Sequence, residues 1–306
     1  MIFEKEKKVE IHFEIMDRCL LKCKHCSSMA SILGREKKYS EQDMFSLLEK
    51  INGKKEVFLT GGEPLLYKEL EKMLKSIRQI PDTQLGLFTT GILMDVGGIS
   101  PISEVYAKKL QECGLEICYL SVYSYLEEEH DWMTRLHGSF KMLNESIKHL
   151  QKAGIEVRFN SVVTKKNYLL YEKLIEFAES SGVTEVRILK LIRQGRAKEC
   201  WQDIAVTEED YRNIVLNAVK RSNKLRITAS GAIDILPCRI NNNNISICPA
   251  GVGVVYVTYE GNVFPCASVK TKEKYKIGNI TDADINKKLY TFQKKTKGEI
   301  LCKVPC

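Results

Sequence analysis

Three cysteines that could hold a metal cluster, Cys19, Cys23 and Cys26, lie within eight consecutive residues in the stretch MDRCLLKCKHCSSMA. A cubane 4Fe-4S cluster takes four ligands, normally cysteine thiolates. A set of three leaves one iron with an open position, as in catalytic rather than closed structural metal sites. Zinc is the alternative, with His25 as a further ligand, but zinc more often takes two separated pairs of cysteines. The spacing C-x3-C-x2-C therefore predicts an iron-sulfur cluster that can bind a reactant.

Composition favours a soluble, cytoplasmic protein. The chain of 306 residues has 11 cysteines, an odd number, and it begins with MIFEKEKKVE, which lacks the apolar run of an export signal. A disulfide framework is therefore not expected, and no stretch approaches the roughly 18 apolar residues of a membrane span. The net charge of +8 is spread over the chain, which indicates a solvated basic surface, with an anionic cofactor, peptide or nucleic acid as the alternative. No run of Lys and Arg interleaved with aromatic residues marks a nucleic-acid interface.

Strands and helices alternate along the first two thirds of the chain. Helical apolar spacing separates the strand-like runs, and this alternation predicts a parallel sheet or barrel of the α/β class. In such sheets the carboxyl ends of the strands meet on one face. The cysteines follow the first strand and Gly-Gly-Glu-Pro follows the second, so we expect both on that face. The predicted strands are 9–16, 56–60, 85–90, 116–124, 156–164 and 185–192, and the helices between them are 40–51, 67–80, 105–114, 139–154 and 171–182.

The pattern changes after Arg193. A helix is predicted over 207–223 and a hairpin over 253–266, which turns at Glu260 and Gly261. Five of the 11 cysteines lie between residues 238 and 306. We therefore predict two domains, 1–205 and a small cysteine-rich α+β domain at 206–306.

The cysteine triplet resembles the hallmark of the radical S-adenosylmethionine (SAM) enzymes, C-x3-C-x-aromatic-C. In that family the motif follows the first strand of a partial (β/α)6 TIM-like barrel. The resemblance implies that Cys19, Cys23 and Cys26 hold a 4Fe-4S cluster to which S-adenosyl-L-methionine binds, with His25 in place of the usual aromatic residue. One electron from that cluster would cleave SAM to a 5'-deoxyadenosyl radical, which would abstract a hydrogen atom from the substrate.

The resemblance also implies a binding site for SAM. The stretch Gly-Gly-Glu-Pro resembles the family's loop at the methionine end of SAM, where glycines allow close backbone approach and the Glu carboxylate faces the ammonium group. RQGRA resembles a stretch common in members with a cysteine-rich extension. Ser121 would contact the ribose and carboxylate, Arg135 would pair with the carboxylate, and Leu191 would cover the adenine. The implied contacts at the methionine end are Gly61, Gly62, Glu63 and Pro64.

A second cysteine group resembles the opening of the SPASM and Twitch extensions, C-x9-15-G-x4-C. Twelve residues separate Cys248 from Gly261, and four separate Gly261 from Cys266. The resemblance implies a Twitch-type domain with one auxiliary 4Fe-4S cluster held by Cys248, Cys266, Cys302 and Cys306, although Cys238 could replace one ligand because Cys306 lies at a chain end.

The remaining cysteines carry weaker signals. Cys113 and Cys118 have apolar neighbours and are expected to be packed thiols. Cys200 and Cys238 lie in predicted loops, where either could donate a hydrogen atom to a substrate radical.

The resemblance implies a radical SAM oxidoreductase, and the first hypothesis for its substrate is a ribosomally made peptide or protein. Such enzymes install thioether or carbon-carbon crosslinks or epimerise residues. The alternative is a dehydrogenase or isomerase of a small molecule in antibiotic or sugar biosynthesis. A non-enzymatic electron carrier is a remote alternative, since it needs neither an open iron nor Gly-Gly-Glu-Pro. About eight residues precede the first strand, so we expect a separate leader-peptide recognition protein or direct binding, and flavodoxin or ferredoxin as the reducing partner.

Overall fold

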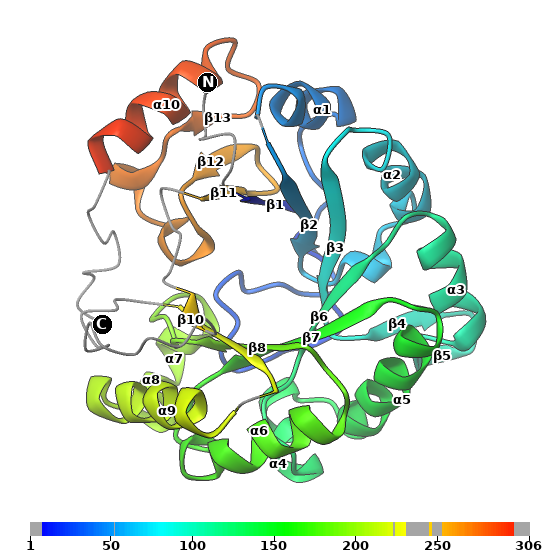
Figure 1. Cartoon of the computed structure of the whole chain (residues 1–306), viewed down its shortest axis with the longest axis vertical. Coiled ribbons are helices and arrows are strands. Elements are labelled where there is room, and N and C mark those ends of the chain that lie inside the picture. Colours follow the sequence, from blue (N-terminus) through cyan, green and yellow to red (C-terminus); the bar gives the residue numbers. More distant parts are fainter. Residues whose placement is uncertain (1–7, 52, 223, 231–244, 247–252, 297–306) are drawn as a thin grey trace.

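The computed structural model describes residues 8–51, 53–222, 224–230, 245–246 and 253–296. Eleven strands within these ranges form one sheet that curves around a central space, with helices on its outer side (Figure 1). All pairs between β10 and β11 in the spatial order are parallel, and β12 and β13 pair antiparallel at the end. The spatial order is β10 (Ile245–Ser246), β9 (Arg226–Ala229), β8 (Glu185–Leu189), β7 (Glu156–Val162), β6 (Ile117–Ser121), β3 (Thr83–Thr89), β2 (Lys55–Gly61), β1 (Val9–Met16), β11 (Val254–Val257), β12 (Asn262–Phe264) and β13 (Gly278–Asn279).

Amphipathic helices cover the outer face of the sheet because each buries one apolar side against the strands. Two of them begin with a capping box, in which Ser40 or Thr207 exchanges hydrogen bonds with an Asp three residues later. No helix in the described ranges is both long and apolar enough to cross a membrane. The helices are α1 (Glu41–Glu49), α2 (Leu70–Ile77), α3 (Glu104–Glu112), α4 (Glu127–Thr134), α5 (Ser139–Lys152), α6 (Tyr171–Ser180), α7 (Arg196–Glu199), α8 (Trp201–Ile204), α9 (Glu208–Arg221) and α10 (Ile285–Thr296), with 3-10 turns η1 (Pro64–Leu66), η2 (Tyr168–Leu170), η3 (Ala267–Val269) and η4 (Glu273–Tyr275).

The predicted fold class is confirmed, since the first six predicted strands form a parallel, barrel-like sheet with an antiparallel addition at its end. β6 and β8 end a few residues earlier than predicted, because the chain leaves the sheet at these points. The sequence reasoning missed the separate hairpin of β4 (Ile92–Asp95) and β5 (Gly98–Pro101). Its signal was the Gly97-Gly98 pair between two short apolar runs.

The predicted hairpin near the C-terminus is confirmed as β11 and β12, and Gly261 adopts φ +83° in its turn. The position of this hairpin was not predicted: β11 pairs in parallel with β1, from Glu10 opposite Val254 to Phe13 opposite Val257. β9 likewise continues the sheet beyond β8. The sheet therefore runs across residue 206, and the division of the chain into domains 1–205 and 206–306 stays a prediction.

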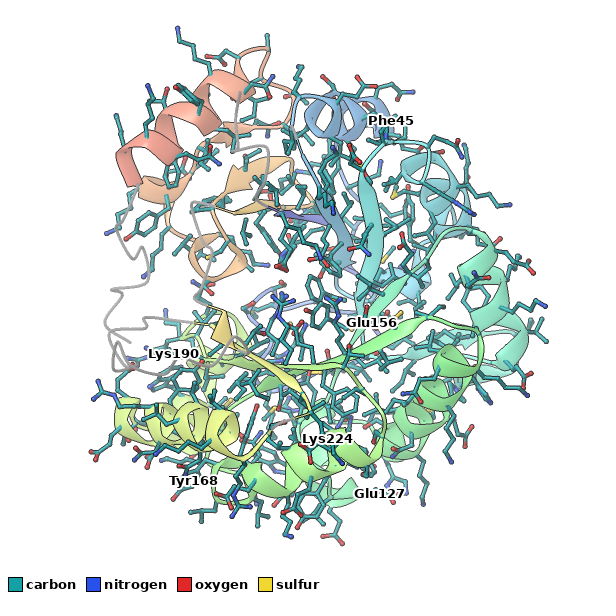
Figure 2. The ribbon with its side chains drawn as sticks, in the orientation of Figure 1. Phe45, Glu127, Glu156, Tyr168, Lys190 and Lys224 are labelled. Atoms are coloured by element: carbon teal, nitrogen blue, oxygen red, sulfur yellow. The ribbon has the colours of Figure 1, made fainter. Side chains whose placement is uncertain are left out.

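Side chains fill the space inside the curved sheet (Figure 2). Phe58, Phe88 and Tyr119 pack there, with the Phe58 and Phe88 ring centroids 4.6 Å apart. Arg187 stacks on Tyr119 and donates to Glu10 at 2.7 Å and to the Tyr119 hydroxyl at 2.8 Å. Aromatic rings and paired charges thus fill the interior of the curved sheet, and the carboxyl ends of the strands remain as the accessible end.

Glu14 joins three distant parts of the chain at that end. Its carboxylate accepts hydrogen bonds from Ser28 on the loop after β1, Tyr256 on β11 and Lys270 after η3. The side chains of Glu14 and Lys270 are only 4% and 8% exposed. A buried pair of this kind leaves an uncompensated charge when one partner is removed.

We predict that Lys270→Met lowers the free energy of unfolding by about 3–5 kcal/mol, because it leaves the Glu14 carboxylate buried without its cation. Urea unfolding under anaerobic conditions measures the change. Adding Glu14→Gln to Lys270→Met should recover part of the loss, since the unpaired charge is then gone.

Lys38→Met is the matched control, because Lys38 and Glu260 also join the loop after β1 to the hairpin but are 55% and 44% exposed. This variant should lose no more than about 1 kcal/mol. Equal losses for Lys38→Met and Lys270→Met would contradict the role given to Glu14.

Candidate active site

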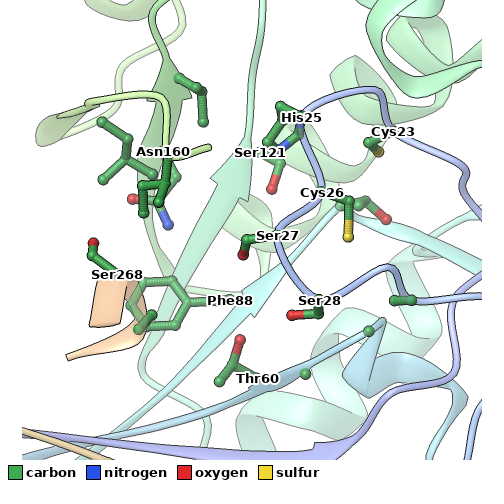
Figure 3. A pocket seen from close by; sticks show the side chains of 18 of the residues that line it. Cys23, His25, Cys26, Ser27, Ser28, Thr60, Phe88, Ser121, Asn160 and Ser268 are labelled. Atoms are coloured by element: carbon green, nitrogen blue, oxygen red, sulfur yellow. The ribbon is translucent and has the colours of Figure 1, made fainter. Parts of the chain in front are cut away.

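A cavity of about 320 Å³ opens at the carboxyl ends of the strands. Cys19, Cys23 and Cys26 line it together with Gly61 and Gly62, as expected for loops that follow neighbouring parallel strands. Figure 3 shows Cys23, His25, Cys26, Ser27 and Ser28 on one side of the cavity, and Phe88, Asn160 and Ser268 on the other. The cavity therefore has a cysteine wall, formed by the loop of residues 19–30, and an opposite wall from β3, β7 and η3.

The cysteine wall is built as a donor set for a metal cluster. Cys19 and Cys23 are each 7% exposed, Cys26 is half-buried, and none of the three is in a disulfide. Burial raises the pKa of Cys19 to about 12 and that of Cys23 well above its usual value, so both thiols must lose a proton when metal binds. Among the described residues, no three His, Cys, Asp or Glu side chains are placed to share one metal ion. A cubane spreads its thiolates over different iron atoms, so this donor set fits the cluster better than zinc.

The glycines of the Gly-Gly-Glu-Pro loop are needed for contact between two loops. A Cβ atom at Gly61 or Gly62 would overlap the carbonyl oxygen of Met16 or Arg18. The Gly62 N–H donates to the Met16 carbonyl at 2.9 Å, and the Glu63 N–H donates to the Arg18 carbonyl at 2.8 Å. These bonds hold the loop after β2 against the start of the cysteine wall, which the sequence reasoning, concerned with approach to a ligand, did not predict.

Glu63 lies behind the cavity wall. It is 1% exposed and is not among the residues that line the cavity. Its carboxylate accepts hydrogen bonds from the hydroxyls of Thr89 at 2.5 Å and Thr90 at 2.6 Å, and from the Thr90 and Leu65 N–H groups at 2.8 and 3.2 Å. Burial raises the pKa of this carboxyl group, against the hydrogen bonds that stabilise its charge. The carboxylate thus fixes the loop to the end of β3, and direct contact with a ligand ammonium stays a prediction.

Three other predicted residues line the cavity: Ser121 at the end of β6, the buried Leu191, and His25. The His25 Nε2 atom lies 3.3 Å from the Tyr123 hydroxyl, and the two ring centroids are 4.7 Å apart. Burial lowers the pKa of His25 to about 4, so its ring is neutral near pH 7. Contacts of these side chains with SAM stay predictions.

Arg135 was predicted at the site, but the structure places it elsewhere. It ends α4 in the left-handed conformation, with φ +58°, and its exposed side chain does not line the cavity. Asp131 binds the Gly138 and Phe140 N–H groups at 2.6 and 2.9 Å and so fixes the short turn from α4 to α5.

Cys200, which was predicted as a possible hydrogen-atom donor, lies beside the cysteine wall, outside the cavity lining. Its Sγ atom lies 3.6 Å from the Lys24 carbonyl and 3.4 Å from the Arg196 carbonyl, and it does not line the cavity. Pro64 begins η1, is buried and likewise does not line the cavity. Cys113 and Cys118 are buried among apolar residues, as predicted.

Only part of the auxiliary group can be placed. Cys266 is half-buried and directly precedes η3, whose Ala267 and Ser268 line the cavity. The other predicted members lie outside the described residues: Cys238, Cys248, Cys302 and Cys306.

The cations of the cavity were not predicted from the sequence. Within the described ranges no Asp or Glu lines it. Carboxylates outside the lining pair with three of its four cations: Glu10 with Arg187, Glu208 with Lys190, and Glu14 with Lys270. Strand alternation in EVRIL could have placed Arg187 inside the barrel, whereas nothing in the local sequence marks Lys270. The cationic lining residues are Arg187, Lys190, Arg196 and Lys270.

We predict that Thr89→Val destabilises the protein by about 1–3 kcal/mol, because it removes a donor from the buried Glu63 carboxylate. The lost hydrogen bond stabilises the ionised form of a carboxyl group whose pKa is already raised. The loss should therefore shrink in mildly acidic buffer, where Glu63 takes up a proton. Denaturant unfolding of the cluster-free chain at two pH values measures both effects.

Thr83→Val is the control, since the Thr83 hydroxyl donates only to the Pro81 carbonyl at the exposed start of β3. Its effect should stay within about 0.5 kcal/mol. A Thr89→Val loss that is small, or that grows as the pH falls, would be inconsistent with this account of Glu63.

Comparison with protein families gives two matches. The model of the radical SAM superfamily matches residues 13–178, and the model of the SPASM iron-sulfur cluster-binding domain matches residues 248–306. The first match includes the cysteine wall and the Gly-Gly-Glu-Pro loop, and the second includes Cys248, Cys266, Cys302 and Cys306.

The curated relatives are distant and diverse. An AdoMet-dependent heme synthase of Oleidesulfovibrio alaskensis is 25% identical over 292 residues, which cover 89% of this chain and 72% of the relative. A GTP 3',8-cyclase of Nautilia profundicola is 30% identical over 208 residues, which cover 64% of this chain and 61% of the relative. The names of these relatives describe different reactions.

Solved structures share the fold. SuiB of Streptococcus suis bound to the precursor peptide SuiA has a TM-score of 0.67 at 14% identity, covering 92% of this chain and 64% of SuiB. anSMEcpe with bound AdoMet and Cp18Cys peptide has a TM-score of 0.68 at 20% identity, covering 94% of this chain and 82% of that protein. The chain thus spans just under two thirds of SuiB and most of anSMEcpe.

The family match spans more than half of the chain, and the cysteines it contains form one wall of the cavity. The cofactors of this family are a 4Fe-4S cluster and SAM, and the C-terminal domain binds auxiliary iron-sulfur clusters. The chain belongs to the radical SAM superfamily and carries a C-terminal SPASM-type iron-sulfur domain.

Proposed function

We propose that this radical SAM enzyme modifies a ribosomally made peptide or protein. The modification would be a thioether or carbon-carbon crosslink, or an epimerisation. The observation that carries the proposal is the two-sided cavity, with three cysteines on one wall and a wall of different chemistry opposite. Proteins with this fold include SuiB with its precursor peptide and anSMEcpe with a bound peptide.

Different residues of the chain would have different roles at this cavity. Cys19, Cys23 and Cys26 would hold the cluster, and the family's pattern assigns Ser121 and Leu191 to SAM. When bound, the cluster and SAM supply the 5'-deoxyadenosyl radical that abstracts the hydrogen atom. Phe88 and Asn160 would orient the substrate on the opposite wall, where burial limits access of water to the reacting atoms.

The charge of the cavity supports an anionic substrate segment. Four cations and no carboxylate line it within the described ranges. Carboxylates outside the lining pair with three of these cations, but the lining itself would present positive groups and no like charge to an acidic side chain near the modified residue. A peptide with acidic residues in its leader or near the reacting residue is therefore the preferred substrate class. A separate leader-recognition protein and a flavodoxin or ferredoxin are the partners that this proposal includes.

A small anionic molecule is the second candidate. The cavity volume of about 320 Å³ lies within the range of small-molecule sites, and the curated relatives include proteins named heme synthase and GTP cyclase. The corresponding reaction would be a dehydrogenation or isomerisation that uses the same clusters.

We predict about eight iron atoms per chain after anaerobic reconstitution, one 4Fe-4S cluster at the cysteine wall and one auxiliary cluster. The auxiliary ligands in this proposal are Cys248, Cys266, Cys302 and Cys306, with Cys238 as the substitute for one. Replacing Cys19, Cys23 and Cys26 by Ala should leave about four iron atoms. About four in the unmutated protein would rule out the second cluster, and about twelve would require a second auxiliary cluster.

The test of substrate class is a comparison of substrates under identical conditions. Reconstituted enzyme with SAM and a reductant should release 5'-deoxyadenosine. The peptide to test is a short precursor found among the reading frames beside this gene. Release should rise, and the peptide should change in mass or stereochemistry, when that peptide is added. The Cys19, Cys23 and Cys26 triple variant is the control. Stimulation by a tetrapyrrole or nucleotide, with none by the peptide, would favour the second candidate.

A further inference from the structure

The segment that follows β8 binds the cysteine wall. The Arg196 guanidinium donates from Nε to the Cys23 carbonyl at 2.8 Å and from Nη1 to the Ala30 carbonyl at 2.9 Å. The Arg196 main-chain N–H donates to the Cys26 carbonyl at 3.0 Å. One residue thus holds the loop at three carbonyl groups, two of which belong to cluster-binding cysteines.

Gly195 brings the two backbones into direct contact. It adopts φ +55° and ψ −137°, a conformation that side chains other than that of glycine rarely allow. A Cβ atom there would overlap the Cys26 carbonyl oxygen and lie 2.7 Å from the Ser27 carbonyl oxygen. Because these are backbone atoms, the loop cannot move aside without losing its shape.

Cys200 completes the contact from the end of α7. Its Sγ atom lies near the carbonyls of Lys24 and Arg196, between the segment and the loop. Residues 195–200 and the cysteine wall are therefore packed together along most of the wall's length.

Arg196 also differs from the other cations of the cavity. Arg187, Lys190 and Lys270 each pair with a carboxylate. Among the residues that the structure describes, the bonds of Arg196 go to carbonyl oxygens and no carboxylate pairs with it. Its full positive charge thus lies against the loop that carries the three thiolates, and the low dielectric of a buried site strengthens the attraction between this charge and a nearby anion.

We infer that Arg196 is a positioning residue for the first cluster: with Gly195 it fixes the cysteine wall in its ligating shape, and its unpaired charge stabilises the reduced cluster. This inference rests on the cluster of the proposed function and deepens it. Reduction adds one electron, supplied by a low-potential carrier protein or by dithionite, and so makes the cluster more negative. A nearby cation favours that added charge, and groups around a metal site commonly tune both retention and potential.

Three variants separate the two parts of the role. Arg196→Gln removes the charge but keeps an N–H donor. Arg196→Lys keeps the charge but cannot donate to two carbonyl groups with the geometry of a guanidinium. Gly195→Ala disturbs the backbone contact alone. Arg193→Gln is the matched control, because Arg193 lies in the same segment, is exposed and does not line the cavity. Circular dichroism and thermal unfolding of each reconstituted full-length variant identify any that fail to fold.

Two properties of the first cluster are measured: its rate of loss to a chelator and its midpoint potential. Both are followed by electron paramagnetic resonance, using the part of the signal that changes when SAM is added. Arg196→Gln and Gly195→Ala should lose this cluster about 10–100-fold faster than Arg193→Gln. Only Arg196→Gln should shift the midpoint potential of the first cluster downward. Arg196→Lys keeps the positive charge and should have the potential of the unmutated protein.

Equal cluster loss in all four folded variants would overturn the positioning role, and an unchanged potential in Arg196→Gln would overturn the charge effect. If Arg196→Gln does not fold, Gly195→Ala and Arg196→Lys still test retention, and a normal retention in both would reject the inference. No substrate enters these measurements, so an incorrect substrate class leaves their outcome unaffected.

Discussion

The site depends on the direct backbone contact between the loops that follow β1 and β2. Gly61 and Gly62 lie so close to Met16 and Arg18 that no Cβ atom fits between them. This contact sets the separation between the cysteine wall and the loop at the methionine end of the expected SAM site. Glu63 then locks the second loop onto β3 through the hydroxyls of Thr89 and Thr90. The Gly-Gly-Glu-Pro motif therefore holds parts of the protein's own chain together, whether or not a ligand is bound.

Much of this site could be predicted because its determinants are local. The spacing of Cys19, Cys23 and Cys26 carries its chemistry wherever the loop folds, and the alternation of strands and helices predicts that the loops after β1 and β2 share one end of the barrel. The ends of β6 and β8 were predicted a few residues too late, because the chain leaves the sheet there without a Gly or Pro signal.

The rest could not be predicted because it joins residues far apart in the sequence. Glu14 and Lys270 are 256 positions apart, and no local pattern connects them. Arg135 was predicted at the site because a family pattern gives the identity of a residue, whereas the end of α4 at Arg135, with its left-handed backbone, depends on the fold around it. The bonds of Glu63 to Thr89 and Thr90 were not predicted, because these residues lie 26 and 27 positions further along the chain.

The pairing of β1 with β11 has a consequence for the order in which the protein can be built. The strand on one of the two sides of β1, Val254–Val257, leaves the ribosome about 240 residues after β1 itself. Until then one edge of β1 exposes unpaired backbone groups beside the nascent cysteine wall, and such an edge invites association with other chains. Glu14 belongs to this strand, and Tyr256 and Lys270 can reach its carboxylate only after the later segment has been made. The parts that Glu14 joins in the folded protein therefore leave the ribosome at widely separated times.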